Sequence, residues 1–161
     1  MPPIISPATP VDLPAILELL DRSKLPRAGL DEHVATTLVV KEGKRLVGTA
    51  ALELYGDCAL LRSVAVAADR RGQGLGLALT AAALDLARRR GVHTVYLLTE
   101  TAGEFFPRFG FQLVALTEEA EAVLRSTEFT TACPQSALVM KLSISTPPSP
   151  RTRAPPPPPR D

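Results

Sequence analysis

The sequence predicts a mixed α/β fold in which helices flank a mostly antiparallel sheet of about six or seven strands. Three short segments rich in β-branched and aliphatic residues follow one another through tight turns between residues 35 and 66. A glycine-rich loop, a long amphipathic helix and a further strand come next, over residues 71–99. Because a strand reached through a helical crossover lies parallel to the strand before it, we expect one parallel pair in the sheet.

Length and composition fit a single domain with one core, since the chain has 161 residues and 45% of them are hydrophobic. The formal net charge of +1 and the aromatic content of 4% give no reason to expect a nucleic-acid or membrane-surface partner. Two cysteines cannot form a disulfide framework, and the N-terminus lacks the features of a signal peptide. No apolar run approaches the roughly 18 residues that span a bilayer. We therefore expect a cytoplasmic protein.

The first predicted elements are a short strand at Ile4 and Ile5 and a helix. The helix should begin at Asp12, a residue type that caps helix N-termini, and should end before Pro26. One face of this helix is apolar, through Leu13, Ile16, Leu17 and Leu20. Residues 24–32 are expected to form a loop.

Three strands joined by two turns follow this loop. The strands are predicted at residues 35–40, 45–54 and 60–66. Glu42-Gly43 supplies the first turn and Tyr55-Gly56-Asp57 the second. The three strands should form an antiparallel meander.

The glycine loop predicts a ligand that carries a pyrophosphate. Gly72, Gly74 and Gly76 alternate with larger residues where the helix begins, so that backbone N–H groups can approach a polyanion at the helix N-terminus. A tight turn with no ligand is the alternative on glycine spacing alone. A Walker loop is excluded because Leu77 and Ala78 follow Gly76 in place of Lys and Ser or Thr. A dinucleotide fingerprint that starts at Gly72 is excluded because residue 77 is neither Gly nor Ala.

The helix after this loop is predicted from Leu75 to Arg90, because apolar positions recur at spacings of three and four, and Gly91 ends it. The remaining elements are a strand at 94–99, a short helix at 101–108, a strand at 111–116, a short helix at 118–125 and a strand at 137–142. One domain is therefore expected over residues 1–142.

Residues 143–161 differ from the rest in composition. They are rich in proline, with Ser, Thr and Arg between the prolines, and such a segment buries little apolar surface. We predict a disordered Pro-rich tail. A ligand for a polyproline-binding module is the alternative.

Two segments resemble motifs of the GNAT N-acetyltransferases. The residues Val64-Ala65-Val66 followed by Arg71-Gly72-Gln73-Gly74-Leu75-Gly76 resemble the family's acetyl-CoA-binding motif, which reads Gln or Arg, two residues, Gly, any residue, then Gly or Ala. Phe105-Phe106-Pro107-Arg108-Phe109-Gly110-Phe111 is similar to the family's Phe-Tyr-x-x-x-Gly-Phe segment. The resemblance implies a GNAT-like fold in which the strands at 60–66 and 94–99 form a parallel pair that splays apart at the cofactor cleft.

The same resemblance implies acetyl-CoA as co-substrate. In the family the pantetheine arm enters between the splayed strands, and a backbone N–H near Val64 to Val66 meets the thioester oxygen. The cofactor-binding residues that the resemblance implies are Val64, Ala65, Val66, Arg71, Gly72, Gln73, Gly74, Leu75, Gly76 and Phe106.

Two catalytic side chains common in the family are replaced here. Arg62 stands where many members have Glu, and Phe106 stands where the family has a Tyr that protonates the departing thiolate. Glu53, near the end of the adjoining strand, is the nearest acidic substitute for the base. Two interpretations of Arg62 stay open. Its planar fork binds an anionic group of the acceptor, or it pairs with Glu53 across the hairpin.

Shorter matches resemble the small GNAT proteins associated with bacterial arsenic resistance. They are Leu25-Pro26 with Gly29-Leu30, Tyr55-Gly56-Asp57, and Thr127-Glu128-Phe129 with Cys133-Pro134. Some of these relatives acetylate amino acids that mimic glutamate, so the resemblance implies an amino acid or an arsenical amino-acid analogue as acceptor.

We therefore expect an enzyme that moves the acetyl group of acetyl-CoA to the primary amine of a small molecule. The alternatives are a non-catalytic acyl-CoA-binding regulatory module and an arsenical sensor, and the sensor requires Cys133 to bind metalloid. No metal site is predicted, because neither His33 nor His93 has a second ligand at a recognisable spacing. The protein should be a monomer or a homodimer.

Overall fold

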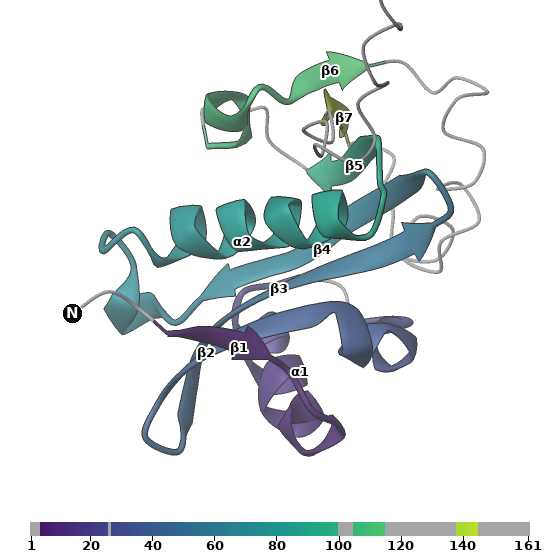
Figure 1. Ribbon diagram of the computed structural model, residues 1–161. Helices are drawn as coiled ribbons and strands as arrows, with labels where there is room; N and C mark the ends of the chain where they lie inside the picture. The colour runs from purple at the N-terminus through teal and green to yellow at the C-terminus, as the bar shows by residue number, and fades with distance from the viewer. Residues whose placement is uncertain (1–3, 26, 100–104, 115–137, 145–161) are drawn as a thin grey trace, which may run out of the picture.

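The computed structural model describes residues 4–25, 27–99, 105–114 and 138–144 (Figure 1). These residues form one seven-stranded sheet with the strand order β1-β2-β3-β4-β5-β7-β6. The strands are β1 (Ile5–Pro7), β2 (Thr37–Glu42), β3 (Arg45–Tyr55), β4 (Cys58–Val66), β5 (Thr94–Thr99), β6 (Gln112–Val114) and β7 (Leu138–Ser143). The pair β4–β5 is parallel and the other neighbouring pairs are antiparallel, which confirms the predicted fold class.

Two α-helices lie on opposite sides of the central strands β3 and β4 (Figure 1). They are α1 (Leu13–Arg22) and α2 (Leu75–Arg89), and short 3-10 helices occur at η1 (Pro10–Asp12), η2 (Leu30–Thr36), η3 (Ala68–Arg70) and η4 (Phe106–Phe109). Both helices direct apolar side chains to the sheet, and Ile16 of α1 and Leu79 of α2 are fully buried. The middle of β3 is buried because a helix covers each of its faces.

The predicted bounds of the central elements agree with the structure, and the main differences occur at 3-10 turns. The strand expected from Ala35 begins at Thr37, because η2 continues through Thr36. The hydroxyls of Thr36 and Thr37 donate to the carbonyl oxygen of His33 at 3.3 and 2.8 Å, and such local bonds compete with strand pairing. The helix expected at 101–108 is described only as η4, and the helix expected at 118–125 lies outside the described residues.

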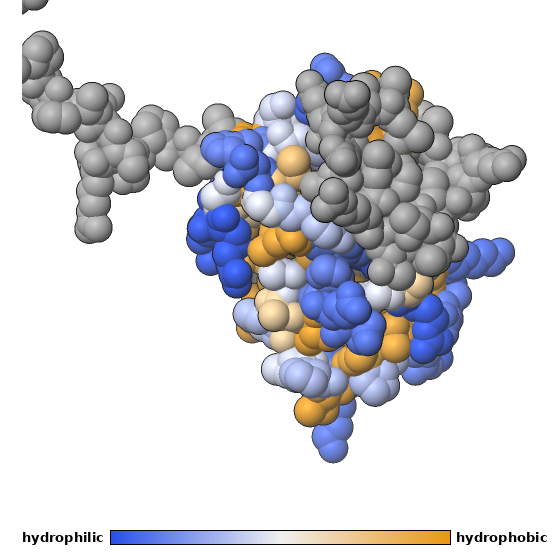
Figure 2. Space-filling model, turned by 90° about the vertical axis from the view of Figure 1, so that its right-hand side faces the viewer, coloured by the Kyte–Doolittle hydropathy of each residue, from blue (hydrophilic) through white to orange (hydrophobic). Residues whose placement is uncertain are grey.

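The face of the molecule shown in Figure 2 mixes hydrophilic residues with small groups of hydrophobic ones. Single exposed apolar side chains are normal on a protein surface and need no partner to explain them. No helix in the described part of the chain is both long and apolar enough to cross a membrane.

The folded domain extends beyond the predicted boundary at residue 142. Ser143 is the last residue of β7, and Ile144 is 4% exposed and belongs to the core. The backbone N–H of Ile144 donates to the carbonyl oxygen of His93 at 2.8 Å. The prediction missed this because the proline-rich composition begins only a few residues later and dominated the whole segment. The rest of the predicted tail, residues 145–161, lies outside the described residues.

Two truncations test where the domain ends. We expect removal of residues 144–161 to lower the melting temperature by about 5–10 °C, because the loss of buried Ile144 and its hydrogen bond costs about 2–4 kcal/mol. Removal of residues 145–161 should leave the melting temperature nearly unchanged. Thermal unfolding followed by circular dichroism compares the two proteins, and equal melting temperatures would contradict a structural role for Ile144.

Candidate active site

The site is built where the two parallel strands part. Pairing between β4 and β5 runs from Cys58 with Thr94 to Leu61 with Leu97. In the described part of the chain, β4 has no partner in β5 beyond Leu61, although it continues to Val66. β5 instead keeps its pairing with β7 to its end. The edge of β4 that faces β5 therefore carries backbone groups that a ligand can bind.

A β-bulge bends β4 at the point of parting. Ala51 of β3 pairs with Arg62, whereas Thr49 pairs with Ala65, so two steps along β3 match three steps along β4. Ser63 and Val64 of β4 therefore lie opposite the single residue Ala50 of β3. Ser63 has a φ of +59°. A residue with a β-carbon in this left-handed region costs about 1–2 kcal/mol, and bulges bend the strand that carries them. The bulge thus turns β4 away from the direction of β5.

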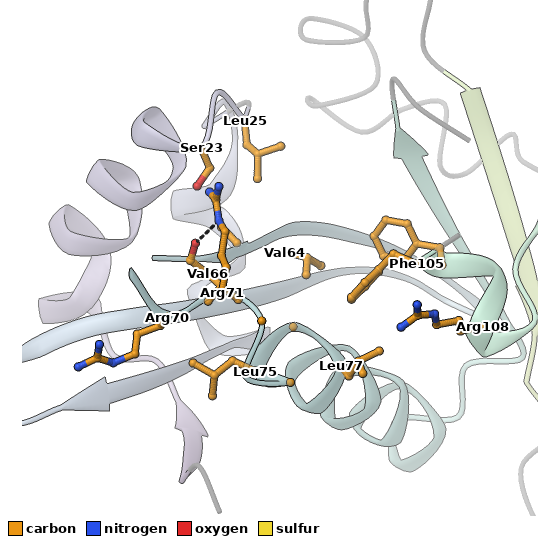
Figure 3. Close-up of a pocket in the computed structure, with 15 residues that line it drawn as sticks. Ser23, Leu25, Val64, Val66, Arg70, Arg71, Leu75, Leu77, Phe105 and Arg108 are labelled. Atoms are coloured by element: carbon orange, nitrogen blue, oxygen red, sulfur yellow. Dashed lines mark hydrogen bonds between the residues drawn. The ribbon is translucent and has the colours of Figure 1, made fainter. Parts of the chain in front are cut away.

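A pocket of about 630 Å³ lies beside this opening (Figure 3). The end of β4, the glycine loop and the first turn of α2 form one part of its lining. Figure 3 shows Ser23 and Leu25, at the end of α1, on one side of Val64, and Phe105 and Arg108 on the other. The described lining residues are Ser23, Leu25, Val64, Ala65, Val66, Arg70, Arg71, Gly72, Gly74, Leu75, Gly76, Leu77, Phe105, Phe106 and Arg108.

The glycine loop presents the N-terminus of α2 to the pocket. Gly72 and Gly74 both have φ of +82°, a conformation that only glycine adopts without strain, and Gly74 is the N-cap of α2. The first N–H groups of a helix have no acceptor within the helix and attract an anion. The guanidinium of Arg71 donates through Nε to the carbonyl oxygen of Val66 at 3.1 Å, which closes the loop.

Positive charge gathers at the same place. Arg70, Arg71 and Arg108 line the pocket, and none of its described lining residues is Asp, Glu or His. No carboxylate in the described part of the chain pairs with Arg108. A negatively charged ligand is therefore favoured over a cationic one.

Ion pairs fix the chain just before the glycine loop. Arg45 donates two hydrogen bonds to Asp69, at 2.8 and 2.6 Å, and this guanidinium lowers the pKa of the Asp69 carboxyl to about 2. Arg70 Nε donates to Glu42 Oε1 at 2.6 Å. These exposed pairs contribute little stability each, but together they join the β2–β3 hairpin to η3. They hold the entry to the loop in one place.

Residues 8–111 match the model of the Acetyltransferase (GNAT) family. The chain belongs to this family. An amino-acid acetyltransferase from Neisseria meningitidis is 31% identical over 105 residues, which are 64% of this chain and 23% of the relative. The chain thus spans about a quarter of the length of the curated relatives it matches.

Solved GNAT structures share the fold. Rv2747 from Mycobacterium tuberculosis, in complex with CoA and NLQ, has 27% identity and a TM-score of 0.73, over 89% of this chain and 100% of that one. The N-acetylglutamate synthase from Neisseria gonorrhoeae, complexed with coenzyme A and N-acetyl-glutamate, has 24% identity and a TM-score of 0.71. That match covers 90% of this chain and 36% of the synthase, and it bears on the fold alone.

Most of the residues expected from the GNAT motif line the pocket. Val64, Ala65, Val66, Arg71, Gly72, Gly74, Leu75, Gly76 and Phe106 do so, and Gln73 does not. The sequence analysis missed Ser23, Leu25, Arg70, Leu77, Phe105 and Arg108. Phe105 and Arg108 could have been predicted from the sequence, because both belong to the second segment that resembles the GNAT family. Ser23 carries no local signal, since only the tertiary fold brings the end of α1 to β4.

Phe106, expected from the resemblance to bind the cofactor, belongs to the lining of the pocket. Its ring packs edge-on against Phe105, with ring centroids 4.9 Å apart, and against Phe111 at 5.9 Å. The Phe105 ring in turn lies 3.3 Å from the point where a β-carbon on Gly76 would be. The aromatic cluster therefore supports the apolar part of the pocket beside the first turn of α2.

Glu53 and Arg62, the predicted catalytic residues, lie together but not in the pocket lining. Arg62 Nη1 donates to Glu53 Oε2 at 2.7 Å, and both side chains are no more than 1% exposed. The Tyr55 hydroxyl also donates to Glu53, and His33 Nε2 lies 3.6 Å from Glu53 Oε1. The geometry thus matches the pairing interpretation of Arg62, and it places neither residue against a ligand in the pocket.

Ser23 provides a test of whether the pocket suits a polar ligand. Its hydroxyl is buried from solvent and has no hydrogen-bond partner within the described residues, although the residue lines the pocket. A buried hydroxyl without a partner is costly, and a bound molecule with amide or carboxylate groups can supply one. CoA fits the pocket for two reasons. Its pantetheine amides can bond with the Ser23 hydroxyl, and its phosphates suit the glycine loop at the start of α2.

Metal ligands and Cys133 were the other candidates for chemistry in the sequence. Within the described residues there is no group of three or more His, Cys, Asp or Glu that could hold a metal ion. Cys133, on which the arsenical sensor depended, lies outside the described residues.

The first prediction for the site compares two glycines with the same backbone conformation. Gly74 and Gly91 have φ of +82° and +79°, and a β-carbon at either would have no atom of the other described residues, apart from its chain neighbours, within 4 Å. Gly74→Ala and Gly91→Ala should therefore destabilise the fold by a similar amount, about 1 kcal/mol. Calorimetric titration with CoA should show weaker binding only for Gly74→Ala, because its new methyl group occupies ligand space. Equal affinities would show that the loop does not contact CoA.

The second prediction concerns unpartnered hydroxyls. Ser23→Ala should leave the free protein as stable as the wild type or slightly more stable, because an unsatisfied polar group is removed. Binding of acetyl-CoA or the KM of the amine should worsen about fivefold, as expected for the loss of one hydrogen bond. Thr80→Val is the control, since Thr80 Oγ1 also lacks a partner but lies on α2 away from the pocket lining. Unchanged constants for Ser23→Ala would exclude a ligand contact.

Proposed function

We propose that this protein is an acetyl-CoA-dependent N-acetyltransferase that acts on the primary amine of an amino acid or a similar small molecule. The observation that carries the proposal is the glycine loop at the start of α2, beside a cleft between two parallel strands that part. This arrangement holds a phosphate-bearing group at the helix N-terminus while a narrow chain extends along β4. Acetyl-CoA has both parts, a pyrophosphate and a pantetheine arm.

Different residues of the pocket would bind different parts of acetyl-CoA. The N–H groups at the start of α2 and the side chains of Arg71 and Arg108 would hold the phosphates. Val64, Val66 and Phe106 supply apolar contacts along the arm. Backbone N–H groups on the open edge of β4 would donate to the thioester oxygen and stabilise the negative charge that develops there.

The reaction requires a neutral amine. Its nitrogen attacks the thioester carbon, the carbon–sulfur bond breaks, and CoA leaves as a thiolate while the amine nitrogen loses a proton. Among the described lining residues no Asp, Glu or His is available to accept that proton, so we propose that water accepts it. A thiol with a pKa near 8.5 leaves without an acid, which is consistent with Phe106 in place of Tyr.

The acceptor class rests on two kinds of support. Curated relatives at 31% identity are named amino-acid acetyltransferases. The described lining residues of the pocket include no carboxylate that would bind a cationic amine such as a polyamine. An arsenical analogue of an amino acid belongs to the same chemical class, and the short matches to arsenic-associated GNAT proteins support that narrower proposal.

A non-catalytic CoA-binding module is the competing function. The observation that favours it is the lack of an acid or base side chain among the described lining residues.

Acetyl transfer itself separates the two functions. Release of the CoA thiol from acetyl-CoA should rise on addition of L-glutamate, L-aspartate or a glutamate-like arsenical, and should stay at the background rate with spermidine. Mass spectrometry of the products should show the amine heavier by one acetyl group. CoA binding by calorimetry without turnover of any amine in the panel would favour the binding module, and turnover of spermidine alone would contradict the proposed acceptor class.

A further inference from the structure

Arg62 is buried between three separate parts of the chain. Its side chain is fully shielded from solvent, and its guanidinium donates three hydrogen bonds among the described residues. Nη1 donates to Glu53 Oε2 and to the carbonyl oxygen of Ala28, both at 2.7 Å, and Nε donates to Ser63 Oγ at 3.1 Å. A planar group with donors in fixed directions can serve partners that a single ammonium cannot.

Each of these partners belongs to a part of the chain that shapes the pocket. Glu53 lies on β3, beside the bulge, and Ser63 is the residue of the bulge with positive φ. Ala28 follows Leu25 by three residues, in the connection from α1 to η2. Ser23 and Leu25, at the start of this connection, line the pocket opposite Phe105 (Figure 3).

We propose that Arg62 is a positioning residue that fixes the connection from α1 to η2 against the bulged part of β4, and thereby sets the wall of the pocket that Ser23 and Leu25 form. The expected change in KM rests on the proposed function, but the coupling of Ala28 to β4 stands on the contacts alone. Arg62 touches no ligand in this scheme. It acts through the backbone of Ala28 and through the bulge.

Charge and burial explain why an arginine can do this. Glu53 neutralises the guanidinium, and Tyr55 and His33 surround the other oxygen of the Glu53 carboxylate. A buried ion pair with further hydrogen bonds is held in one geometry, whereas loss of one partner leaves the other charge buried and unpaired. Two apolar residues of similar size can replace such a pair with little loss of stability, but they cannot bind the carbonyl oxygen of Ala28.

Two variants separate positioning from a merely structural role. Arg62→Lys keeps the charge opposite Glu53 but loses the fork, and the double variant Arg62→Met with Glu53→Leu removes both charges. Arg89→Lys is the matched control, because Arg89 also pairs with a carboxylate, that of Asp85, but on the surface at the end of α2 that lies away from the pocket lining.

Amide hydrogen exchange and calorimetry with CoA need no turnover and therefore test the inference even if the proposed function fails. We expect faster exchange across residues 27–36 in both Arg62 variants and not in Arg89→Lys, with CoA affinity within about twofold of the wild type in all three. With L-glutamate as the acceptor, KM should rise about tenfold in both variants while kcat changes less.

The double variant gives the decisive result. If it melts at the wild-type temperature yet keeps the raised KM and the fast exchange, Arg62 positions the pocket wall. If it restores the KM and the exchange along with the stability, Arg62 is only a structural partner of Glu53 and the inference is overturned. Unchanged exchange at 27–36 in Arg62→Lys would overturn it as well.

Discussion

The parting of β4 from β5 is the constraint on which the site depends. Two parallel strands that stay paired present no backbone groups to a ligand, whereas these strands stop pairing after Leu61 and Leu97. The bulge at Ser63 is the local cause on the β4 side, and it puts a residue other than glycine into a strained conformation. The pairing of β5 with β7 holds β5 on its own course. The cleft is therefore a property of the sheet and needs no ligand to form it.

The buried pair of Glu53 and Arg62 stands next to this cleft. Burying two charges is expensive, and further hydrogen bonds, from Tyr55 to Glu53 and from Arg62 to Ala28 and Ser63, offset part of that cost. Apolar residues would fill the same space with less risk to stability. The pair is therefore better understood through what it connects, the hairpin of β3 and β4 and the connection after α1, than through its contribution to the free energy of folding.

Local signals in the sequence predicted the fold and half of the site. The glycine loop was predictable because glycine reports backbone conformation directly, and the hairpin register places Glu53 and Arg62 on one face as diagonal neighbours. Three features were beyond local reasoning. The residue type at Ser63 does not predict a bulge, since serine also occurs in regular strands. Ser23 reaches the pocket only through the packing of α1. Ile144 was hidden by the composition of the prolines that follow it.

The described sheet also ends in very short strands. β6, at one edge, is described over three residues, and β1, at the other, has three residues and closes with Pro7, which has no N–H to donate. An edge of this kind gives a second chain few backbone groups to pair with. The β1 edge thus opposes growth of the sheet from one molecule to the next, so concentrated protein should resist aggregation through this edge even though its central strands are strongly apolar.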